Sequence, residues 1–274
     1  MQASLKIARM ALGALITCAA VAAQAVPVIV NGGFESGLTG WTRVDQPGSE
    51  GTFHLQSGTS SPVTLFDVPP PPQGERAAMT DAEGPGSHVL YQEFTLLAPV
   101  PLAMLSFDLF VGNRAEDIDG NPLPFETPET LDFATPVLNQ QARVDFITGS
   151  ADPFSVAAAD IVMNFHRTLP ADPTVSGYTH YAFDVTALLN ANLNVPLRLR
   201  FAEVDNVFIF QFGVDNVSLE IGPAQTVPEP ATASLALAAL LAIFLVRRLV
   251  VPQSPLARSR RAVDMRDDTR EPRT

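Results

Sequence analysis

Apolar residues recur at every second position in several segments between residues 31 and 221, as they do in strands with one buried face. The clearest series are Leu105, Phe107 and Leu109; Leu197, Leu199 and Phe201; Phe208, Phe210 and Phe212; and Val217, Leu219 and Ile221, the last after a break at Asp215-Asn216. Further strands are expected at residues 89–96, 142–147, 161–166 and 178–185, and a short helical turn at residues 185–190 capped by Asp184. Numerous strands without intervening helices predict an all-β fold of antiparallel sheets packed face to face.

The composition favours one such domain with long loops. The chain has 24 Pro and 17 Gly, which suit many short strands joined by turns, and 17 Phe, which supply bulk for a core. Four consecutive prolines at residues 69–72 predict an exposed polyproline II loop in segment 68–73. Residues 115–136 are rich in acidic residues and proline and predict a long excursion between strands.

The first 25 residues have the three parts of a secretory signal peptide. Lys6 and Arg9 form a basic start, residues 10–21 are mostly apolar, and Ala23 and Ala25 provide the small residues that signal peptidase requires. The alternative is a retained membrane anchor. Cleavage after Ala25 leaves no cysteine, because Cys18 is the single one in the chain, and this excludes an internal disulfide framework.

The C-terminal region also has three parts in order. Pro228, Glu229 and Pro230 precede an uncharged apolar run at residues 231–246, and Arg247 and Arg248 follow it. Sixteen residues in a helix span about 24 Å, which is shorter than the ~30 Å hydrocarbon core. If residues 249–251 extend the helix, its length approaches that thickness. Residues 26–229 hold 25 acidic and 7 basic residues, a net charge of -18, whereas residues 247–274 hold 8 basic and 4 acidic, a net charge of +4. This asymmetry predicts a transmembrane helix with the acidic domain outside the cytoplasm.

The arrangement of these C-terminal residues resembles the PEP-CTERM sorting signal of Gram-negative bacteria that secrete exopolysaccharide. The resemblance implies a sorting signal at residues 227–248, recognised at Pro228-Glu229-Pro230 by an exosortase-type transpeptidase. It also implies export to the cell envelope, cell surface or extracellular matrix. The chain departs from the family in running 26 residues past Arg248, and residues 249–274 are expected to form a disordered basic tail. An ordinary single-pass anchor is the alternative.

The two ends of the predicted domain, residues 26–226, carry a second resemblance. Asn31-Gly32-Gly33-Phe34-Glu35 with Gly40-Trp41, and the closing series at residues 212–219, are similar to the first and last segments of galactose-binding-like jelly rolls, which include several carbohydrate-binding modules. Residues 181–185 and 197–201 fit the preceding strands. The resemblance implies a jelly-roll β-sandwich and a structural Ca²⁺ with Glu35 and Asp215 as carboxylate ligands; alternatively, these two residues cap turns.

Other candidate chemistry is sparse. The acidic loop at residues 116–121 places carboxylates at alternate positions, but the twelfth position counted from Asp117 is Pro128, so a polar turn is expected rather than a calcium loop. Sugar platforms would need exposed aromatic residues, and Trp41, Tyr91, Tyr178 and Tyr181 all fall in segments expected to pack. The histidines His54, His88, His166 and His180 show no metal spacing, and no nucleophile elbow is present.

A net charge of -12 argues against a nucleic-acid partner. The sequence therefore predicts a non-enzymatic exported protein, sorted by a PEP-CTERM signal and associated with exopolysaccharide or biofilm. The alternatives are a membrane-anchored carbohydrate-binding module and, third, a surface glycosidase or lyase. The residues that bind a ligand are not identified by the sequence.

Overall fold

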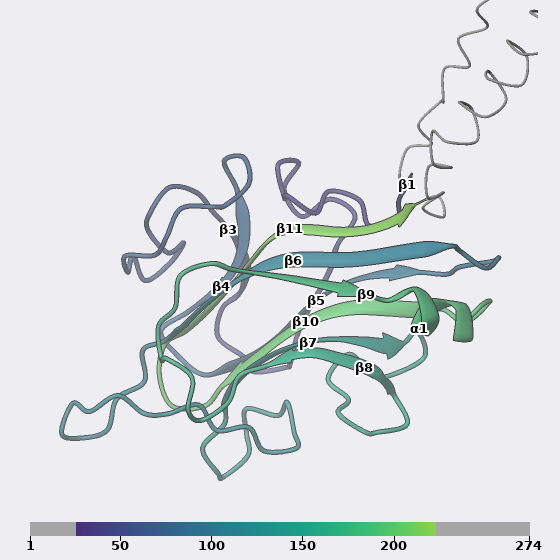
Figure 1. Ribbon diagram of the computed structural model, residues 1–274. Helices are drawn as coiled ribbons and strands as arrows, with labels where there is room; N and C mark the ends of the chain where they lie inside the picture. The colour runs from purple at the N-terminus through teal and green to yellow at the C-terminus, as the bar shows by residue number, and fades with distance from the viewer. Residues whose placement is uncertain (1–25, 223–274) are drawn as a thin grey trace, which may run out of the picture. The chain divides into compact units, whose positions relative to one another are not determined.

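The strands of this chain form two antiparallel sheets packed face to face (Figure 1). A computed structural model describes residues 26–222. Its elements are β1 (Val26–Pro27), β2 (Thr42–Asp45), β3 (Thr52–Gln56), β4 (Ala77–Asp81), β5 (Gly86–Phe94), β6 (Leu102–Asn113), β7 (Gln140–Thr148), β8 (Ile161–Arg167), β9 (Thr179–Asp184), α1 (Thr186–Ala191), β10 (Leu197–Asp205) and β11 (Phe210–Gly222). The predicted antiparallel β-sandwich is confirmed.

The chain crosses repeatedly between the sheets. The first sheet has the order β3-β4-β11-β6-β9, with β1 paired to β11, and the second has the order β2-β5-β10-β7-β8. Strands β4 to β7 alternate between the sheets, and so do β8 to β11, which is jelly-roll connectivity. Strands β9 and β8 therefore lie at the same open side of the sandwich, one at the edge of each sheet.

The core lies between the sheets, where the predicted alternating residues meet. The ring of Phe107 on β6 is central, with centroid distances of 5.7 Å to Phe201 on β10 and 5.9 Å to Phe183 on β9. The expected break in β11 is a shift in register between Asp215 and Ser218. One expectation was wrong: Phe208 lies before β11 and is 45% exposed, because the chain turns at residues 206–208.

The segments that were expected to form loops lie outside the two sheets. Residues 68–73 and 115–136 contain no strand. The expected helical turn is α1, which begins one residue later than predicted and has Val185 rather than Asp184 as its N-cap residue, although the Asp184 carboxylate accepts the N–H of Thr186. Within residues 26–222, no helix is long and apolar enough to cross a membrane. The predicted signal peptide with Ala23 and Ala25, the sorting residues Pro228, Glu229, Pro230, Arg247 and Arg248, the helix at 231–246 and the tail lie outside the described residues.

Candidate functional site

The opening loop and the closing strand lie against each other, and their two carboxylates bind one neighbouring segment. The N–H of Val217 donates to the carbonyl of Gly32 at 3.0 Å. The Oε1 atom of Glu35 accepts the N–H groups of residues 75 and 76 at 2.8 and 2.9 Å. The Asp215 carboxylate accepts the N–H of Gln73 at 2.8 Å and that of Asn216 at 2.7 Å. Glu35 and Asp215 thus hold residues 73–76 as a main-chain clamp.

The two carboxylates of this clamp are also the expected ligands of the predicted Ca²⁺. Burial, together with the nearby carboxylates of Asp108 and Glu35, raises the pKa of Asp215 to about 7. Three of the four carboxylate oxygens of Glu35 and Asp215 accept N–H groups, and residues 26–222 contain no group of three or more His, Cys, Asp or Glu residues that could hold a metal. As arranged, the pair fits N–H donors better than a cation, and calcium binding stays a prediction.

The acidic loop forms a closed polar turn. Asp117 Oδ1 accepts the N–H groups of Asp119 and Asn121, both at 2.9 Å, and the turn is exposed. These bonds satisfy the carboxylate locally, as expected for a solvated turn.

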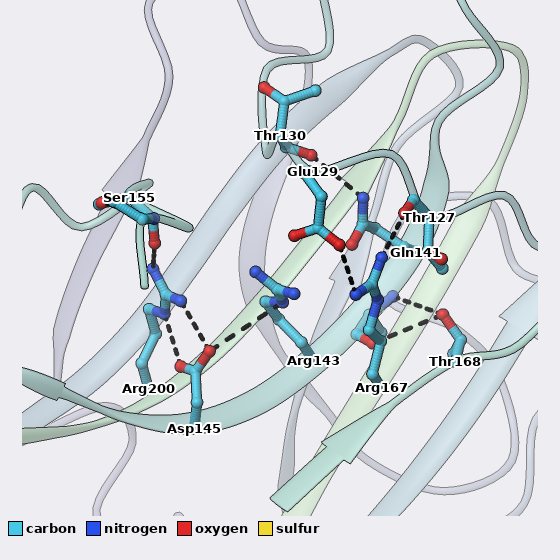
Figure 2. A network of polar contacts seen from close by, with 12 residues as sticks. Thr127, Glu129, Thr130, Gln141, Arg143, Asp145, Ser155, Arg167, Thr168 and Arg200 are labelled. Carbon is cyan, nitrogen blue, oxygen red and sulfur yellow. Dashed lines mark hydrogen bonds and ion pairs between the residues drawn. The ribbon is translucent and has the colours of Figure 1, made fainter. Parts of the chain in front are cut away.

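Figure 2 shows an arginine network on the outer face of the second sheet. Arg200 forms a bidentate ion pair with Asp145 at 2.8 and 2.7 Å and also donates to the carbonyls of Pro153 and Ser155. Arg167 donates to Glu129 and to the carbonyl of Thr127. These bonds hold the loops at residues 126–139 and 150–160 over the sheet, where Leu131, Phe133, Phe154 and Val156 pack on Val89, Ala202 and Val204. This face is covered by the chain's own loops.

Arg143 is the exception in this network. It is 3% exposed, and its nearest carboxylate oxygen, on Asp145, lies 4.0 Å from Nε. Its Nε and Nη1 atoms have no hydrogen-bond partner among residues 26–222. Burial and the neighbouring guanidinium groups of Arg200 and Arg167 lower its pKa.

A hollow of about 390 Å³ lies at the open side of the sandwich, between β6 and β9 of one sheet and β8 of the other. We call it the edge hollow. Its lining residues are Leu109, Val111, Phe125, His166, Arg167, Thr168, Leu169, Asp172, Pro173, Ser176, Thr179 and Tyr181. A volume of this size matches that of small-molecule sites, in which apolar walls carry a few polar groups.

Two aromatic rings from opposite sheets meet in the wall of the edge hollow. The half-buried rings of Tyr181 on β9 and His166 on β8 have centroids 5.0 Å apart. Burial lowers the pKa of His166 and raises that of Tyr181, so both side chains are neutral at pH 7. The Nε2 atom of His166 has no hydrogen-bond partner within residues 26–222. The edge hollow therefore combines two uncharged aromatic side chains with the polar side chains of Arg167, Asp172, Ser176 and Thr179.

The other aromatic and histidine candidates serve the fold. Trp41 is 8% exposed, packs on Phe34 and Phe201, and donates its Nε1–H to the carbonyl of Asn31. Tyr91 lies under the guanidinium of Arg198 at 4.7 Å, and the hydroxyl of Tyr178 donates to Gln56. His88 pairs with Asp45 at 2.8 Å and His180 with Asp108 at 2.7 Å, while His54 lies on β3. Of the aromatic and histidine candidates, Tyr181 and His166 are the two that line the edge hollow.

Several lining residues of the edge hollow could not be singled out from the sequence. Phe125, Asp172 and Ser176 lie in irregular loops, where no periodicity relates them to β8 or β9. Ser176 is fixed because its Oγ accepts the N–H of Val111 at 3.1 Å, and Asp172 accepts the N–H of Leu169 at 2.8 Å. Alternation predicted the strands that carry His166 and Tyr181, but their meeting depends on how the two sheet edges pair.

Comparison with known proteins finds solved structures of low similarity and low sequence identity. No family model and no curated protein matches the chain. Among solved structures, the carbohydrate-binding module TmCBM61, determined with β-1,4-galactotriose, has a TM-score of 0.40 and 10% identity over 71% of this chain and 97% of its own. The Stig cyclase Fisc from Fischerella sp. TAU has a TM-score of 0.40 and 17% identity, covering 74% of this chain and 100% of its own. The K3 adhesin domain of Lys-gingipain from Porphyromonas gingivalis has a TM-score of 0.41 and 12% identity, covering 71% of this chain and 98% of its own. These proteins differ in function, and the likeness assigns none of their functions to this chain.

Proposed function

We propose that the β-sandwich is a non-catalytic sugar-binding domain whose site is the edge hollow. The observation that carries the proposal is the pairing of Tyr181 and His166, two half-buried aromatic rings, in the wall of a hollow of about 390 Å³. A sugar ring presents apolar C–H groups to an aromatic face and hydroxyl groups to its rim. The edge hollow offers both kinds of partner, because Thr179, Ser176 and Asp172 lie among its apolar residues.

The charges favour a neutral glycan. Residues 26–229 carry a net charge of -18, which repels a polyanion unless divalent cations bridge the two. Asp172 is the one carboxylate among the lining residues, whereas hydrolysis of a glycosidic bond ordinarily requires two. These features support binding rather than hydrolysis, and a neutral rather than an acidic sugar.

The proposed setting is the cell envelope or extracellular matrix of a Gram-negative bacterium. The order of a signal peptide, a β domain, Pro228-Glu229-Pro230, an apolar run and Arg247-Arg248 supports export and sorting by an exosortase-type transpeptidase. The edge hollow lies where Leu109 and Val111 pair with Val214 and Phe212, away from Gly222, at which the described chain ends. In this setting, exopolysaccharide is the proposed ligand of the edge hollow.

The proposal is tested by isothermal titration calorimetry of the full chain in mild detergent against neutral gluco- and galacto-oligosaccharides. Thr179→Trp places a bulky side chain in the edge hollow from an exposed strand position and should weaken binding at least tenfold. Leu97→Ala, an exposed apolar residue beyond β5, is the matched control and should bind as the wild type does. Saturable binding that Thr179→Trp leaves unchanged would place the site elsewhere, and an absence of binding would contradict the proposed function.

A further inference from the structure

A second hollow of about 360 Å³ lies beside the edge hollow, among the loops at one end of the sandwich. We call it the loop-end hollow. Its walls include Phe66, Arg114, Glu116, Val175 and Phe208. Residues Phe66 and Phe208 are 36% and 45% exposed, although most phenylalanines of the domain are buried in its core. Exposed aromatic residues beside polar ones are typical of binding sites.

One chain segment separates the two hollows. Pro173 and Ser176 line the edge hollow, whereas Thr174 and Val175 line the loop-end hollow. The segment is fixed to β6, because Asn113 donates its N–H to the carbonyl of Thr174 at 2.7 Å and Ser176 donates its N–H to that of Val111 at 2.8 Å. Residues 172–176 therefore form a fixed ridge, the width of a single chain segment, between two neighbouring hollows.

The loop that carries Phe66 is held in place by the fold. The carboxylate of Asp81 accepts the N–H groups of Val63 and Thr64 at 2.7 and 2.8 Å. Leu65 has a φ of 61°, a conformation that costs energy for a branched residue, and its side chain is 71% exposed. The strained backbone at Leu65 lowers the stability of the fold, while the loop keeps Leu65 and Phe66 at the surface.

Arg114 completes the wall. Its guanidinium lies 5.1 Å from the centre of the Phe66 ring, and its Nε donates to the Oε1 atom of Gln211 at 3.1 Å. Its Nη2 donates to the carbonyl of Asp67 at 3.1 Å. A ring and a cation held in this way lose little conformational entropy when a ligand binds.

We propose that the edge hollow and the loop-end hollow are adjacent subsites for one glycan chain, which crosses the ridge at residues 172–176. This inference rests on the proposed function and names its ligand class: an internal stretch of a neutral polysaccharide, rather than a single sugar or a chain end. Exposed residues occur in the walls of both hollows, and Val175 on the ridge is 40% exposed, so a chain can continue past either one. Linking two weak subsites through one ligand raises the affinity above that of either.

The test measures how affinity depends on chain length. The full chain, in mild detergent, is titrated with β-1,4-linked glucose and galactose oligosaccharides of one to six residues. The wild type should bind the hexasaccharide at least tenfold more tightly than the disaccharide. Phe208→Ala should abolish that gain and leave disaccharide affinity within about twofold of wild type, because the disaccharide occupies the edge hollow. Leu97→Ala is the control and should keep the full gain.

The outcomes separate this inference from the proposed function. Wild-type affinity that does not rise with length would overturn the shared-chain arrangement while leaving sugar binding intact. So would two short chains bound per protein without a gain for long ones, because that result means independent sites. An absence of binding at every length would contradict the proposed function itself. Phe66→Ala provides a second test of the loop-end hollow, and an unaltered gain in both variants overturns the inference.

Discussion

At the scale of single residues, the arginine network separates paired from unpaired buried charge. Arg143→Met removes a buried guanidinium whose Nε and Nη1 lack hydrogen-bond partners among residues 26–222, while Asp145 keeps its bidentate pair with Arg200. Because hydrophobic replacement of a poorly compensated buried charge is often favourable, we expect unfolding free energy to rise by about 1–3 kcal/mol. Arg200→Met leaves Asp145 buried without its main partner and should lower it by about 3–5 kcal/mol. Urea unfolding of both variants measures these changes in unfolding free energy. If Arg143→Met destabilises the protein as much as Arg200→Met does, Arg143 has a partner.

A second residue-scale prediction concerns Glu203, which is 1% exposed and faces the first sheet. Burial and the Asp205 carboxylate raise its pKa well above the ordinary 4.5. The other titratable groups around this pair are Asp45, Glu50 and His88. Since the folded pKa exceeds the unfolded one, the stabilisation is complete below about pH 4.5 and is lost as pH rises through the raised value.

Glu203→Gln should therefore flatten the decline in melting temperature as pH rises above about 4.5, because the amide has no carboxyl proton to lose. Glu220→Gln, at an exposed position on β11, is the control and should leave the pH profile unchanged. If the melting temperature falls with pH equally steeply in the wild type and in Glu203→Gln, the buried pair of Glu203 and Asp205 does not control the decline.

At the scale of elements, alternation of apolar and polar residues predicted the strands whose sequence alternates and missed strands whose sequence does not. Strands β6 and β10 were found from Leu105, Phe107 and Leu109, and from Leu197, Leu199 and Phe201. The sequence of β4, Ala77–Asp81, is buried at every position and has no period of two, so β4 was not predicted. The four-residue β2 is too short for a pattern. The hollows were not predictable, because loop residues such as Phe125, Asp172 and Phe208 complete their walls and no periodicity relates these loops to the strands.

The clamp formed by Glu35 and Asp215 holds the main chain of residues 73–76. Asp215→Ala leaves the N–H groups of Gln73 and Asn216 without their acceptor and should lower the unfolding free energy by about 1–3 kcal/mol. Asp117→Ala, in the exposed acidic turn, should leave the unfolding free energy nearly unchanged. EDTA tests the predicted Ca²⁺: if Glu35 and Asp215 serve as acceptors of N–H groups alone, EDTA leaves the wild-type melting temperature unchanged. A fall of about 4 °C or more with EDTA, absent in Asp215→Ala, would instead establish a bound cation.

At the scale of the whole molecule, charge divides the chain into an acidic domain of net -18 and a basic end of net +4, separated by residues 231–246. This division agrees with transfer of the domain across a membrane while the arginines stay behind. It does not distinguish a permanent anchor from a sorting signal, since both need a positive cytoplasmic end. The distinction depends on Pro228, Glu229 and Pro230, which an ordinary anchor does not require.

We therefore expect that, in a Gram-negative host with an exosortase, mass spectrometry finds the exported domain without residues beyond the sorting tripeptide. Combined Pro228→Ala, Glu229→Ala and Pro230→Ala should leave the chain at its unprocessed mass in the membrane fraction, because the transpeptidase loses its recognition sequence while the hydrophobic run persists. Arg258→Ala with Arg260→Ala changes the tail beyond the signal and is the matched control, with processing retained. Protein that retains residues 231–274 in every variant, in hosts with and without the enzyme, would identify residues 231–246 as a permanent anchor that holds the β-sandwich domain at the membrane.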